Sequence, residues 1–543
     1  MKNRHTYIFV TGGVMSGVGK GIASASLAAL LKAAGLRVTV IKIDQYINVD
    51  AGTMNPIEHG EVFVTHDGDE TDQDIGNYER FLDEDVLKMN YITTGRVYQA
   101  VIERERSLGY HGKTVEAVPH IPLEVIGRIR RAATHHKADV TIIEVGGTVG
   151  EYQNVLYLEA ARMMKIEAPK DVLIGLVSYL PVPGSLGEMK TKPTQYAVRT
   201  LNGTGLQPDF IICRSTLAVD EPRKQKIAVN CSMQMEDIIS CPDVPSIYAV
   251  PSHLYREGLP QRLLQKFGFK KRTFKIKAWE DLEKRVLACS RPVRIGIVGK
   301  YISTGDFVLS DAYLSVLEAI KHAAWSMHRQ PEIVWLNAEE LEQTKKPADL
   351  LKRLDGIVVP GGFGTRGIEG KLIAIRYARE QKIPYLGLCY GMQLATVEVA
   401  RTLLGWKDAN TTEINPATTH PVIHLMDEQE MKMKNKNYGG TMRLGAFPCQ
   451  LRSGSLAATL YGQTMILERH RHRYEYNPAY RAELEQAGLL ATGVSPDGKL
   501  IELVELKNHP FFIASQFHPE FLSRPMRPHP LFVGLLKAAG KIR

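Results

Sequence analysis

Residues 385–393 of this chain read YLGLCYGMQ, an apolar run that meets a cysteine with a glycine two positions away on either side. The pattern G-x-C-x-G after a strand predicts a sharp turn into a helix, with the side chain of Cys389 held at the turn. The amino terminus of such a helix favours a thiolate and directs main-chain N–H groups at a developing oxyanion. A buried structural cysteine would also fit a glycine-rich turn, but both glycines stand where a nucleophile turn needs them. We therefore predict that Cys389 is a nucleophile.

A nucleophilic thiol needs a base and a group that orients the base. Residues 516–520, QFHPE, follow the apolar run FFIAS, so His518 and Glu520 lie two residues apart at a strand end and can face the same side. The glycine-rich residues 361–364, after DGIVVP, offer N–H groups for an oxyanion hole together with the amide of Tyr390. These three parts predict acyl transfer through a thioester.

If the acyl donor is glutamine, the leaving group of this reaction is ammonia. Glu413, in ANTTEI, and Arg473, in HRHRYE, carry the charges needed to hold the α-amino and α-carboxylate groups of glutamine. Both are equally consistent with ordinary surface residues.

The amino-terminal half carries a glycine-rich loop, TGGVMSGVGKG at residues 11–21, between an apolar strand and a helix. Such loops fold main-chain N–H groups around phosphate, and Lys20 adds a positive charge. The usual nucleotide loop is G-x-x-x-x-G-K-[ST]; here Val14 replaces the first glycine and Gly21 replaces the hydroxyl that binds magnesium. A plain strand-to-helix turn is the alternative, but the position at the first crossover of a parallel sheet favours a ligand site.

Because Gly21 supplies no hydroxyl, other oxygens must hold a metal, and Mg²⁺ prefers carboxylates, water and phosphate. Glu144 directly follows the strand residues VTII, and Asp74 ends the acidic run DGDETDQD, which would otherwise be a solvated loop. Lys42, at the end of the second strand, could reach the same phosphates. KTKPTQ, residues 190–195, indicates a second anion site, although a polar surface turn explains these residues about equally well.

Apolar runs that alternate with helical stretches predict an α/β fold with two doubly wound, mostly parallel sheets. The first half opens with a strand at residues 7–13, a helix at 22–34 and a strand at 38–43; the second opens with a strand at 293–298 and a helix at 311–324. Further strands are expected at residues 140–145, 172–177, 210–213, 246–250, 333–336, 356–359 and 385–388. Residues 265–291, with an amphipathic helix near 279–289, are expected to connect the halves, and residues 432–440 to form a surface loop.

The composition fits this fold class: 543 residues suit two to four domains, and 44% hydrophobic with 23% charged residues excludes disorder, collagen and coiled coil. Six cysteines without a CxxC pair give no disulfide framework or cysteine-rich zinc site, so a reducing compartment is expected. The chain shows neither an apolar signal sequence nor a membrane-spanning run, which indicates a cytoplasmic protein. The net charge of +9 is spread along the chain, which favours anionic small molecules over nucleic acid or a membrane as partners.

Together the motifs resemble those of the CTP synthase family, the glutamine-dependent amidotransferases of pyrimidine nucleotide synthesis. The resemblance runs along nearly the whole chain, through VTGGVMSGVGKG, KIDQYINVDAGTMNP, HGEVFVT, ETDQD, EVGGTVG, KTKPTQ, PGGFGTRG, GLCYGMQ, GGTMRLG, RHRYE and FHPE. It implies an amidoligase domain with a deviant P-loop at residues 1–270, a linker at 271–292 and a class I glutaminase domain at 293–543. The implied reaction converts UTP, ATP, glutamine and water to CTP, ADP, phosphate and glutamate, and ammonia is expected to pass between the sites by a sheltered route.

The resemblance also implies a role for each matching residue. Cys389 is the expected nucleophile, His518 the base and Glu520 its orienting acid, and Mg²⁺ bound with ATP is expected on Asp74 and Glu144. The expected ATP contacts are Gly17, Val18, Gly19, Lys20, Gly21, Ile22, Lys42, Asp74 and Val244. The expected UTP or CTP contacts are Ser16, Glu151, Lys190, Thr191, Lys192, Pro193, Thr194, Gln195 and Lys226. The expected glutamine contacts are Gly362, Tyr390, Gly391, Met392, Gln393, Glu413 and Arg473.

Family resemblance further implies feedback inhibition by CTP, activation by GTP that involves Arg366, a homotetramer and the capacity to form filaments. Two departures bear on regulation. The residues after EVGGTVG are Glu151, Tyr152 and Gln153 rather than an acidic GDIE-type run, and Leu314 stands where some relatives carry a basic residue.

Two alternatives stay open. A glutamine-dependent amidase of cobyrinate type shares the deviant phosphate loop, although KTKPTQ and the YINVDAGTMNP stretch favour a pyrimidine substrate. A non-catalytic nucleotide-binding assembly protein is the second, and the complete set of Cys389, His518 and Glu520 argues against it.

Overall fold

The computed structural model describes residues 4–184, 187–300, 303–304, 307–308, 310–426, 429 and 439–541. The chain divides into two compact units: Met1–Asp50 with Asn77–Leu287, and Ala51–Gly76 with Ala288–Arg543. The short segment Ala51–Gly76 therefore belongs to the second unit, although it interrupts the first in sequence. The surface loop expected at residues 432–440 falls almost entirely outside the described residues.

In the described residues of the first unit, seven parallel strands form one sheet in the order β5-β2-β6-β1-β7-β8-β9. These strands are β1 Thr6–Gly13, β2 Val38–Asp44, β5 Tyr91–Thr93, β6 Val140–Val145, β7 Val172–Tyr179, β8 Phe210–Ser215 and β9 Ile238–Pro242. Every residue of β1 and β6 is buried, as expected for continuous apolar strands covered on both faces. The predicted α/β class with a parallel sheet is confirmed.

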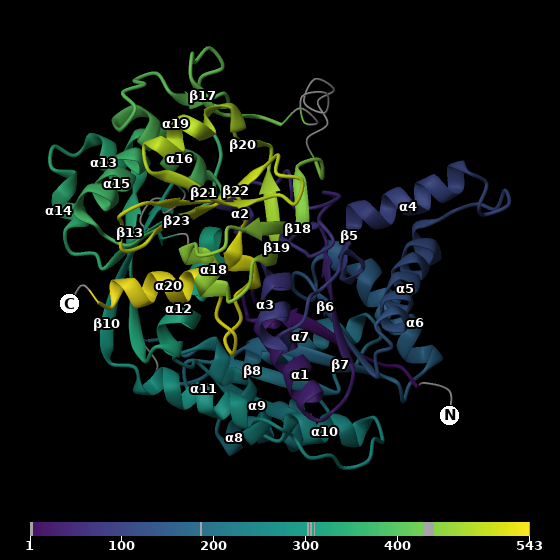
Figure 1. The fold of residues 1–543 in the computed structure, drawn as a ribbon. Coiled ribbons are helices and arrows are strands. Elements are labelled where there is room, and N and C mark those ends of the chain that lie inside the picture. The colour runs from purple at the N-terminus through teal and green to yellow at the C-terminus, as the bar shows by residue number, and fades with distance from the viewer. Residues whose placement is uncertain are drawn as a thin grey trace. The chain divides into compact units, whose positions relative to one another are not determined.

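Two groups of helices pack against this sheet. One apolar cluster joins it to α4 Thr94–Arg106, α5 Ala117–His135 and α6 Val155–Glu167, and Figure 1 shows α5 and α6 side by side. A second cluster joins it to α7 Lys192–Gly203 and α8 Glu221–Asn230. The remaining α-helices of this unit are α1 Lys20–Ala33, α9 Val250–Arg256, α10 Leu259–Lys266 and α11 Lys277–Ala288. Of α3 Gln73–Leu82, residues 77–82 belong to this unit.

The prediction of a strand at residues 246–250 is wrong. Residues Ile247–Ala249 form a 3-10 turn that leads into α9, and the Ser246 side chain accepts a hydrogen bond from the Tyr248 N–H. A five-residue apolar run does not distinguish a strand from a helix, and this local cap decides the outcome. The amphipathic helix predicted near residues 279–289 is α11, and its Trp279 ring lies 5.4 Å from that of Phe81 within the first unit.

In the described residues of the second unit, nine strands form a mixed sheet in the order β13-β10-β14-β15-β23-β22-β21-β18-β19. Pairings from β13 to β23 are parallel, and those from β23 to β19 are antiparallel. The strands are β10 Arg291–Gly299, β13 Arg329–Asn337, β14 Gly356–Val359, β15 Tyr385–Leu388, β18 Arg443–Leu451, β19 Met465–His472, β21 Leu489–Val494, β22 Ile501–Leu506 and β23 Phe512–Ser515.

Helices cover this second sheet in two apolar clusters. One holds α12 Leu314–Ser326 and α20 Pro530–Ala539, and the other holds α15 Ile368–Gln381 and α16 Tyr390–Thr402. Shorter elements are α2 Pro56–His59, β3 Phe63–Val64, β4 Glu70–Thr71, β11 Ser303–Thr304, β12 Phe307–Val308, α13 Ala338–Gln343, α14 Pro347–Leu351, β16 Asn410–Thr411, β17 Pro421–Leu425, α18 Leu456–Tyr461, β20 Tyr474–Tyr476 and α19 Arg481–Gln486.

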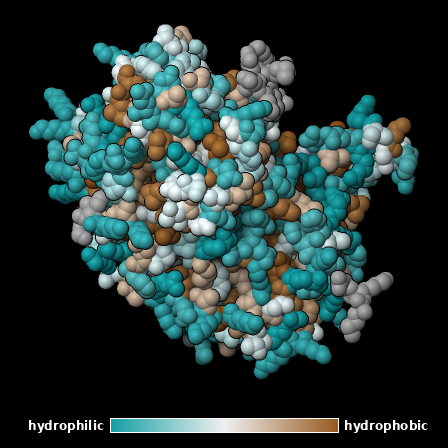
Figure 2. Space-filling view, viewed as in Figure 1, coloured by the Kyte–Doolittle hydropathy of each residue, from teal (hydrophilic) through white to brown (hydrophobic). Residues whose placement is uncertain are grey.

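The surface is that of a protein with many charged side chains. Figure 2 shows a face on which hydrophilic residues predominate and apolar ones are scattered among them. Within the described residues, no helix has the length and apolar character needed to cross a membrane.

Candidate active site

The turn at Cys389 has the geometry that its sequence predicts. β15 ends directly before this cysteine and α16 begins directly after it, and Cys389 adopts φ 50° and ψ −98°. A Cβ on Gly391 would overlap the carbonyl oxygen of Val359, and one on Gly387 would lie 2.7 Å from the hydroxyl of Tyr385. Both positions therefore need glycine, and the strained cysteine is held at the end of the strand.

His518 and Glu520 follow β23, the strand beside β15. His518 Nδ1 lies 2.7 Å from Glu520 Oε1, and the imidazole stacks on the ring of Phe521 with centroids 5.0 Å apart. Burial alone would lower the pKa of His518, but the charges of Glu520 and Cys389 raise it to about 10. Because Nδ1 of His518 is hydrogen-bonded to Glu520, its other ring nitrogen, Nε2, is the one available to Cys389.

The glycine-rich residues 361–364 follow β14, which borders β15 on its other side. A Cβ on Gly361 would lie 2.8 Å from His518 Cε1, so the loop runs directly past the imidazole. Thiol, base and glycine loop are thus brought together at the carboxyl ends of three adjacent parallel strands, which is where open α/β sheets bind ligands.

These groups line a cavity of about 690 Å³ within the second unit, a volume suited to a small molecule. Of the predicted glutamine contacts, Gly362, Gln393, Glu413 and Arg473 line this cavity. Tyr390, Gly391 and Met392 are buried in the first turn of α16. Residues of Ala51–Gly76 line it as well: Gly52, Thr53, Met54, Pro56, Glu61 and Val62.

A carboxylate and a guanidinium face the same cavity, as a zwitterionic amino acid requires. Burial raises the pKa of Glu413, although the Gly364 N–H and Lys300 act in the opposite direction. Arg473 Nη1 donates to Gln429 Oε1 at 2.7 Å and to Thr441 Oγ1 at 3.0 Å. Both side chains line the same cavity, and each is held by hydrogen bonds to neighbouring residues.

Two buried lysines beside this site were missed by the sequence analysis. Lys300, directly after β10, is 6% exposed and contacts the glycine loop. Lys371, in α15, is fully buried, and within the described residues its Nζ has no hydrogen-bond partner. Burial and the charge of Lys300 lower the pKa of Lys371 to about 7, although Cys389 acts in the opposite direction. The burial of Lys371 could have been predicted from the sequence, because this lysine stands inside the apolar helical pattern IEGKLIAI.

A third missed feature is the ion pair between Arg471 and Glu70. Arg471 Nε lies 2.8 Å from Glu70 Oε1, and the Arg471 carbonyl lies 3.7 Å from Cys389 Sγ. Since Glu70 belongs to the segment Ala51–Gly76, its ion pair with Arg471 joins residues 401 positions apart, and no local sequence pattern predicts it.

In the first unit, the glycine-rich loop joins β1 to α1 as predicted. Val14 adopts φ 79°, in the left-handed region of backbone conformation. The usual motif has glycine at this position, and glycine adopts this conformation more easily than valine. Lys20 Nζ donates to the carbonyl of Gly147 at 2.7 Å. Ser16 and Gly17 are exposed, whereas Val18 and Gly21 are buried and Gly19 and Ile22 are half-buried.

Lys42 and Glu144 lie side by side at the ends of β2 and β6. Lys42 Nζ is 3.0 Å from Glu144 Oε1, the Tyr78 hydroxyl donates to Glu144 Oε2, and Asp44 lies near the same ammonium. Asp74 lies in the first turn of α3, in the part of that helix assigned to the second unit.

The described residues hold no group of three or more His, Cys, Asp or Glu side chains that could bind a metal ion by themselves. The carboxylates of Asp74 and Glu144 nevertheless suit Mg²⁺, which usually completes its shell with water and nucleotide phosphate. Each of the two carboxylates fits Mg²⁺ by ligand type, and Glu144 is also engaged by Lys42 and Tyr78.

The turn after β6 is held by Glu151. Its carboxylate accepts hydrogen bonds from the Thr148 N–H at 2.8 Å, the Thr148 hydroxyl at 2.6 Å and Gln45 Nε2 at 2.6 Å. Burial would raise the pKa of Glu151, but these hydrogen bonds lower it overall. In this structure Glu151 stabilises its own turn.

The KTKPTQ motif forms the approach to α7 and its first residues. The Thr194 hydroxyl is buried against Ser178 Oγ at 2.8 Å, and Gln195 Nε2 donates to Thr191 Oγ1 at 3.2 Å. Lys190 pairs with Glu188 at 2.6 Å. Lys192 is exposed and Pro193 is half-buried in the first turn of α7, and Lys226 is exposed on α8.

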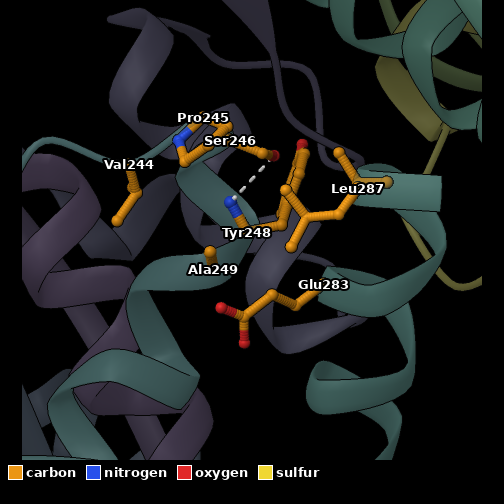
Figure 3. Close-up of a pocket in the computed structure, with 8 residues that line it drawn as sticks. Val244, Pro245, Ser246, Tyr248, Ala249, Glu283 and Leu287 are labelled. Atoms are coloured by element: carbon orange, nitrogen blue, oxygen red, sulfur yellow. Dashed lines mark hydrogen bonds between the residues drawn. The ribbon is translucent and has the colours of Figure 1, made fainter. Parts of the chain in front are cut away.

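Val244 borders a small pocket of about 40 Å³, with Tyr248, Glu283 and Leu287 among the residues around it (Figure 3). This volume is close to that of one water molecule. The pocket is therefore too small to enclose a nucleotide base.

Arg366, expected to take part in GTP activation, and Leu314, noted as a departure from some relatives, both belong to the second unit. Arg366 is 68% exposed and its Nε lies 2.7 Å from Glu339 Oε1, and Leu314 is the first residue of α12.

The family model described as CTP synthase N-terminus matches residues 6–269, and that of glutamine amidotransferase class-I matches residues 308–538. A CTP synthase from Prochlorococcus marinus is 49% identical over 534 residues, covering 98% of this chain and 95% of the relative. A CTP synthase from Thermosynechococcus vestitus is 50% identical over 536 residues, covering 98% of this chain and 97% of the relative.

A solved structure of the Trypanosoma brucei CTPS glutaminase domain with bound acivicin is 40% identical to the matching part. It covers 46% of this chain and 94% of its own chain, with a TM-score of 0.42.

Proposed function

This chain belongs to the CTP synthase family, and we propose that it forms CTP from UTP with ATP and with ammonia released from glutamine. The observation that carries the proposal is the convergence of Cys389, His518 and Glu520 on a cavity that also presents a carboxylate and a guanidinium. Relatives named CTP synthase over nearly the whole chain do not favour the cobyrinate-type alternative.

In the glutaminase reaction, the thiol proton of Cys389 passes to His518, and the resulting thiolate attacks the side-chain carbonyl carbon of glutamine. A C–S bond forms and an electron pair moves onto the carbonyl oxygen, where the N–H groups of Gly362 and Tyr390 stabilise it. The C–N bond then breaks as protonated His518 gives its proton to the departing nitrogen, and ammonia leaves. His518 next takes a proton from water, whose oxygen attacks the thioester, so that glutamate and the thiolate are released.

The substrate is held by its two charged ends. We assign Glu413 to the α-amino group and Arg473 to the α-carboxylate, with Gly362, Tyr390, Gly391, Met392 and Gln393 around the amide. Glu520 acts through His518. The hydrogen bond from His518 Nδ1 to the Glu520 carboxylate fixes the tautomer of the imidazole and stabilises its protonated form.

In the synthetase reaction, the γ-phosphoryl group of ATP passes to O4 of UTP and ADP leaves. Ammonia then attacks C4, and the bond from C4 to the phosphorylated oxygen breaks, which gives CTP and phosphate. Lys20 and Lys42 would place ammonium groups at the phosphates. Asp74 and Glu144 would hold Mg²⁺, which offsets phosphate charge when it is bound.

The nucleotide contacts and the domain limits are proposals of the same kind. We assign ATP to residues 17–22, Lys42, Asp74 and Val244, and UTP or product CTP to Ser16, Glu151, residues 190–195 and Lys226. We assign synthesis to residues 1–270 and glutamine hydrolysis to residues 293–543, joined by a linker at 271–292. CTP feedback, GTP activation through Arg366 and a homotetramer also belong to this proposal.

The test is the conversion of UTP to CTP by the full-length protein, followed by absorbance with ATP, Mg²⁺ and either glutamine or an ammonium salt. The parent should use both nitrogen sources, and Cys389→Ala should use only ammonium, because the substitution removes the nucleophile. No CTP from the parent with either nitrogen source would overturn the proposal.

A further inference from the structure

The side chain of Lys300 ends on the glycine-rich loop beside the thiol. Its Nζ donates to the carbonyl of Phe363 at 2.9 Å and to the carbonyl of Gly364 at 2.7 Å. These are the two residues that follow Gly362, whose N–H is assigned to the oxyanion. Since a buried ammonium must find acceptors, the two carbonyls fix both the lysine and the loop.

The same lysine contacts Tyr390, the residue after the nucleophile. Lys300 Nζ lies 4.9 Å from the centroid of the Tyr390 ring, and the Tyr390 hydroxyl donates to the carbonyl of Gly364 at 3.0 Å. The main-chain N–H of Tyr390 is the second group assigned to the oxyanion. Lys300 and the Tyr390 side chain therefore tie the loop that bears one donor to the residue that bears the other.

A carboxylate completes this arrangement from another element. Glu413 Oε1 accepts a hydrogen bond from the Gly364 N–H at 2.8 Å, so the Gly364 carbonyl and the Gly364 N–H are both held. Burial lowers the pKa of Lys300 to about 8, with Arg366 acting in the same direction and Glu413, Glu342 and Glu339 against it. The ammonium form is therefore the main one at neutral pH.

We propose that Lys300 is a positioning residue of the glutaminase reaction: it holds residues 363–364 so that the N–H groups of Gly362 and Tyr390 converge on the substrate oxygen. The inference rests on the proposed function and assigns to Lys300 a role that acts through these two N–H groups. Loss of one oxyanion donor costs roughly 100–1,000-fold in kcat, and a donor left in place but misdirected should cost less.

The experiment uses full-length Lys300→Met, which keeps an unbranched side chain and removes the ammonium. We expect kcat for glutamate release from glutamine to fall roughly 10–100-fold, with KM for glutamine little changed, because the lost interaction acts mainly in the transition state. The rate at which iodoacetamide alkylates Cys389 should stay close to that of the parent, since this reagent needs no oxyanion hole. CTP formation from ammonium should be retained.

Two further variants keep the test decisive. Tyr390→Phe removes the second donor to the Gly364 carbonyl and should lower kcat in the same way but less, even if Lys300→Met folds poorly. Lys352→Met removes an exposed lysine from the end of α14 and should leave every rate unchanged.

Unchanged glutamate release by Lys300→Met, or a parallel loss of Cys389 alkylation that indicates general disruption of the site, would overturn the inference. A parent enzyme that releases no glutamate from glutamine would instead contradict the proposed function, so the two failures are distinguishable.

Discussion

Lys42 Nζ and Glu144 Oε1 lie 3.0 Å apart, on side chains that are 6% and 1% exposed. They stand on the neighbouring strands β2 and β6, where Lys42 pairs directly with Glu144 in the parallel register. Removing one partner of a buried ion pair typically costs about 3–5 kcal/mol, because the other charge is left without compensation. Any neutral substitution of Glu144 leaves the Lys42 ammonium uncompensated, so a test of its role must show that the variant stays folded.

Glu144→Gln should abolish CTP formation from both glutamine and ammonium, because a neutral amide neither holds Mg²⁺ well nor balances Lys42. Basal glutamate release should remain, since that reaction uses groups of the second unit. Both rates are measured on the same preparation, with Asp74→Asn as a second variant that leaves the Lys42–Glu144 pair intact. Normal CTP formation by both variants would remove these carboxylates from the metal site.

Glu520→Gln should lower kcat for glutamine hydrolysis by about 100–10,000-fold, because the amide neither fixes the His518 tautomer nor stabilises the imidazolium. Glutamate release measures this loss, and CTP formation from ammonium is the internal control. A variant with nearly normal glutamate release would show that the 2.7 Å contact between Glu520 and His518 is structural.

The same variant tests the charge of His518. Its folded-state pKa, about 10, lies above the unfolded value of about 6.5. The stabilisation from Glu520 is therefore fully present below about pH 6.5 and is lost as pH rises through about 10. Urea unfolding should show Glu520→Gln to be destabilised more at pH 6 than at pH 10.5, and an equal loss at both values would contradict a charged His518.

The sequence predicted the parallel strands and the catalytic turn well, because both depend on local patterns. The apolar runs that became β6, β14 and β15 have the predicted bounds, and the glycines around Cys389 stand where neighbouring atoms leave no room for a Cβ. The contacts of Glu70 and Lys300 could not be predicted in this way. Glu70 pairs with Arg471, and Lys300 donates to Phe363 and Gly364. These partners are far apart in sequence and meet only in the folded chain.

Gly391→Ala should inactivate the glutaminase, because the added Cβ would overlap the Val359 carbonyl and displace the start of α16. Gly362→Ala is the matched control for an added methyl group, since its nearest neighbours would be 3.7 Å and 3.9 Å away. Glutamate release and Cys389 alkylation should both fall in Gly391→Ala, whereas alkylation should persist in Gly362→Ala. Full activity of Gly391→Ala would mean that the turn relaxes more easily than its geometry indicates.

Arg473→Gln should raise KM for glutamine about 10–100-fold with a smaller effect on kcat, because a hydrogen bond to a charged group is worth about 1.5–3 kcal/mol in both ground and transition states. The steady-state rate of glutamate release as a function of glutamine concentration measures both constants. Arg452→Gln, a change in the loop after β18 away from the cavity residues, is the control and should leave KM unaltered. A fall in kcat alone would assign Arg473 to another step.

Lys371→Met should stabilise the protein. The Nζ of Lys371 is fully buried, has no hydrogen-bond partner among the described residues and lies 5.3 Å from the centroid of the Tyr390 ring. Burial, the largest cause, holds its folded-state pKa at about 7, below the unfolded value of about 10.4. The unfolded chain therefore binds more protons between these values, so the lysine destabilises the fold increasingly as pH falls from about 10 to 7. Urea unfolding should show Lys371→Met to be more stable than the parent, by a larger margin at pH 7 than at pH 10. A variant less stable than the parent at pH 7 would mean that the ammonium makes a favourable contact in solution.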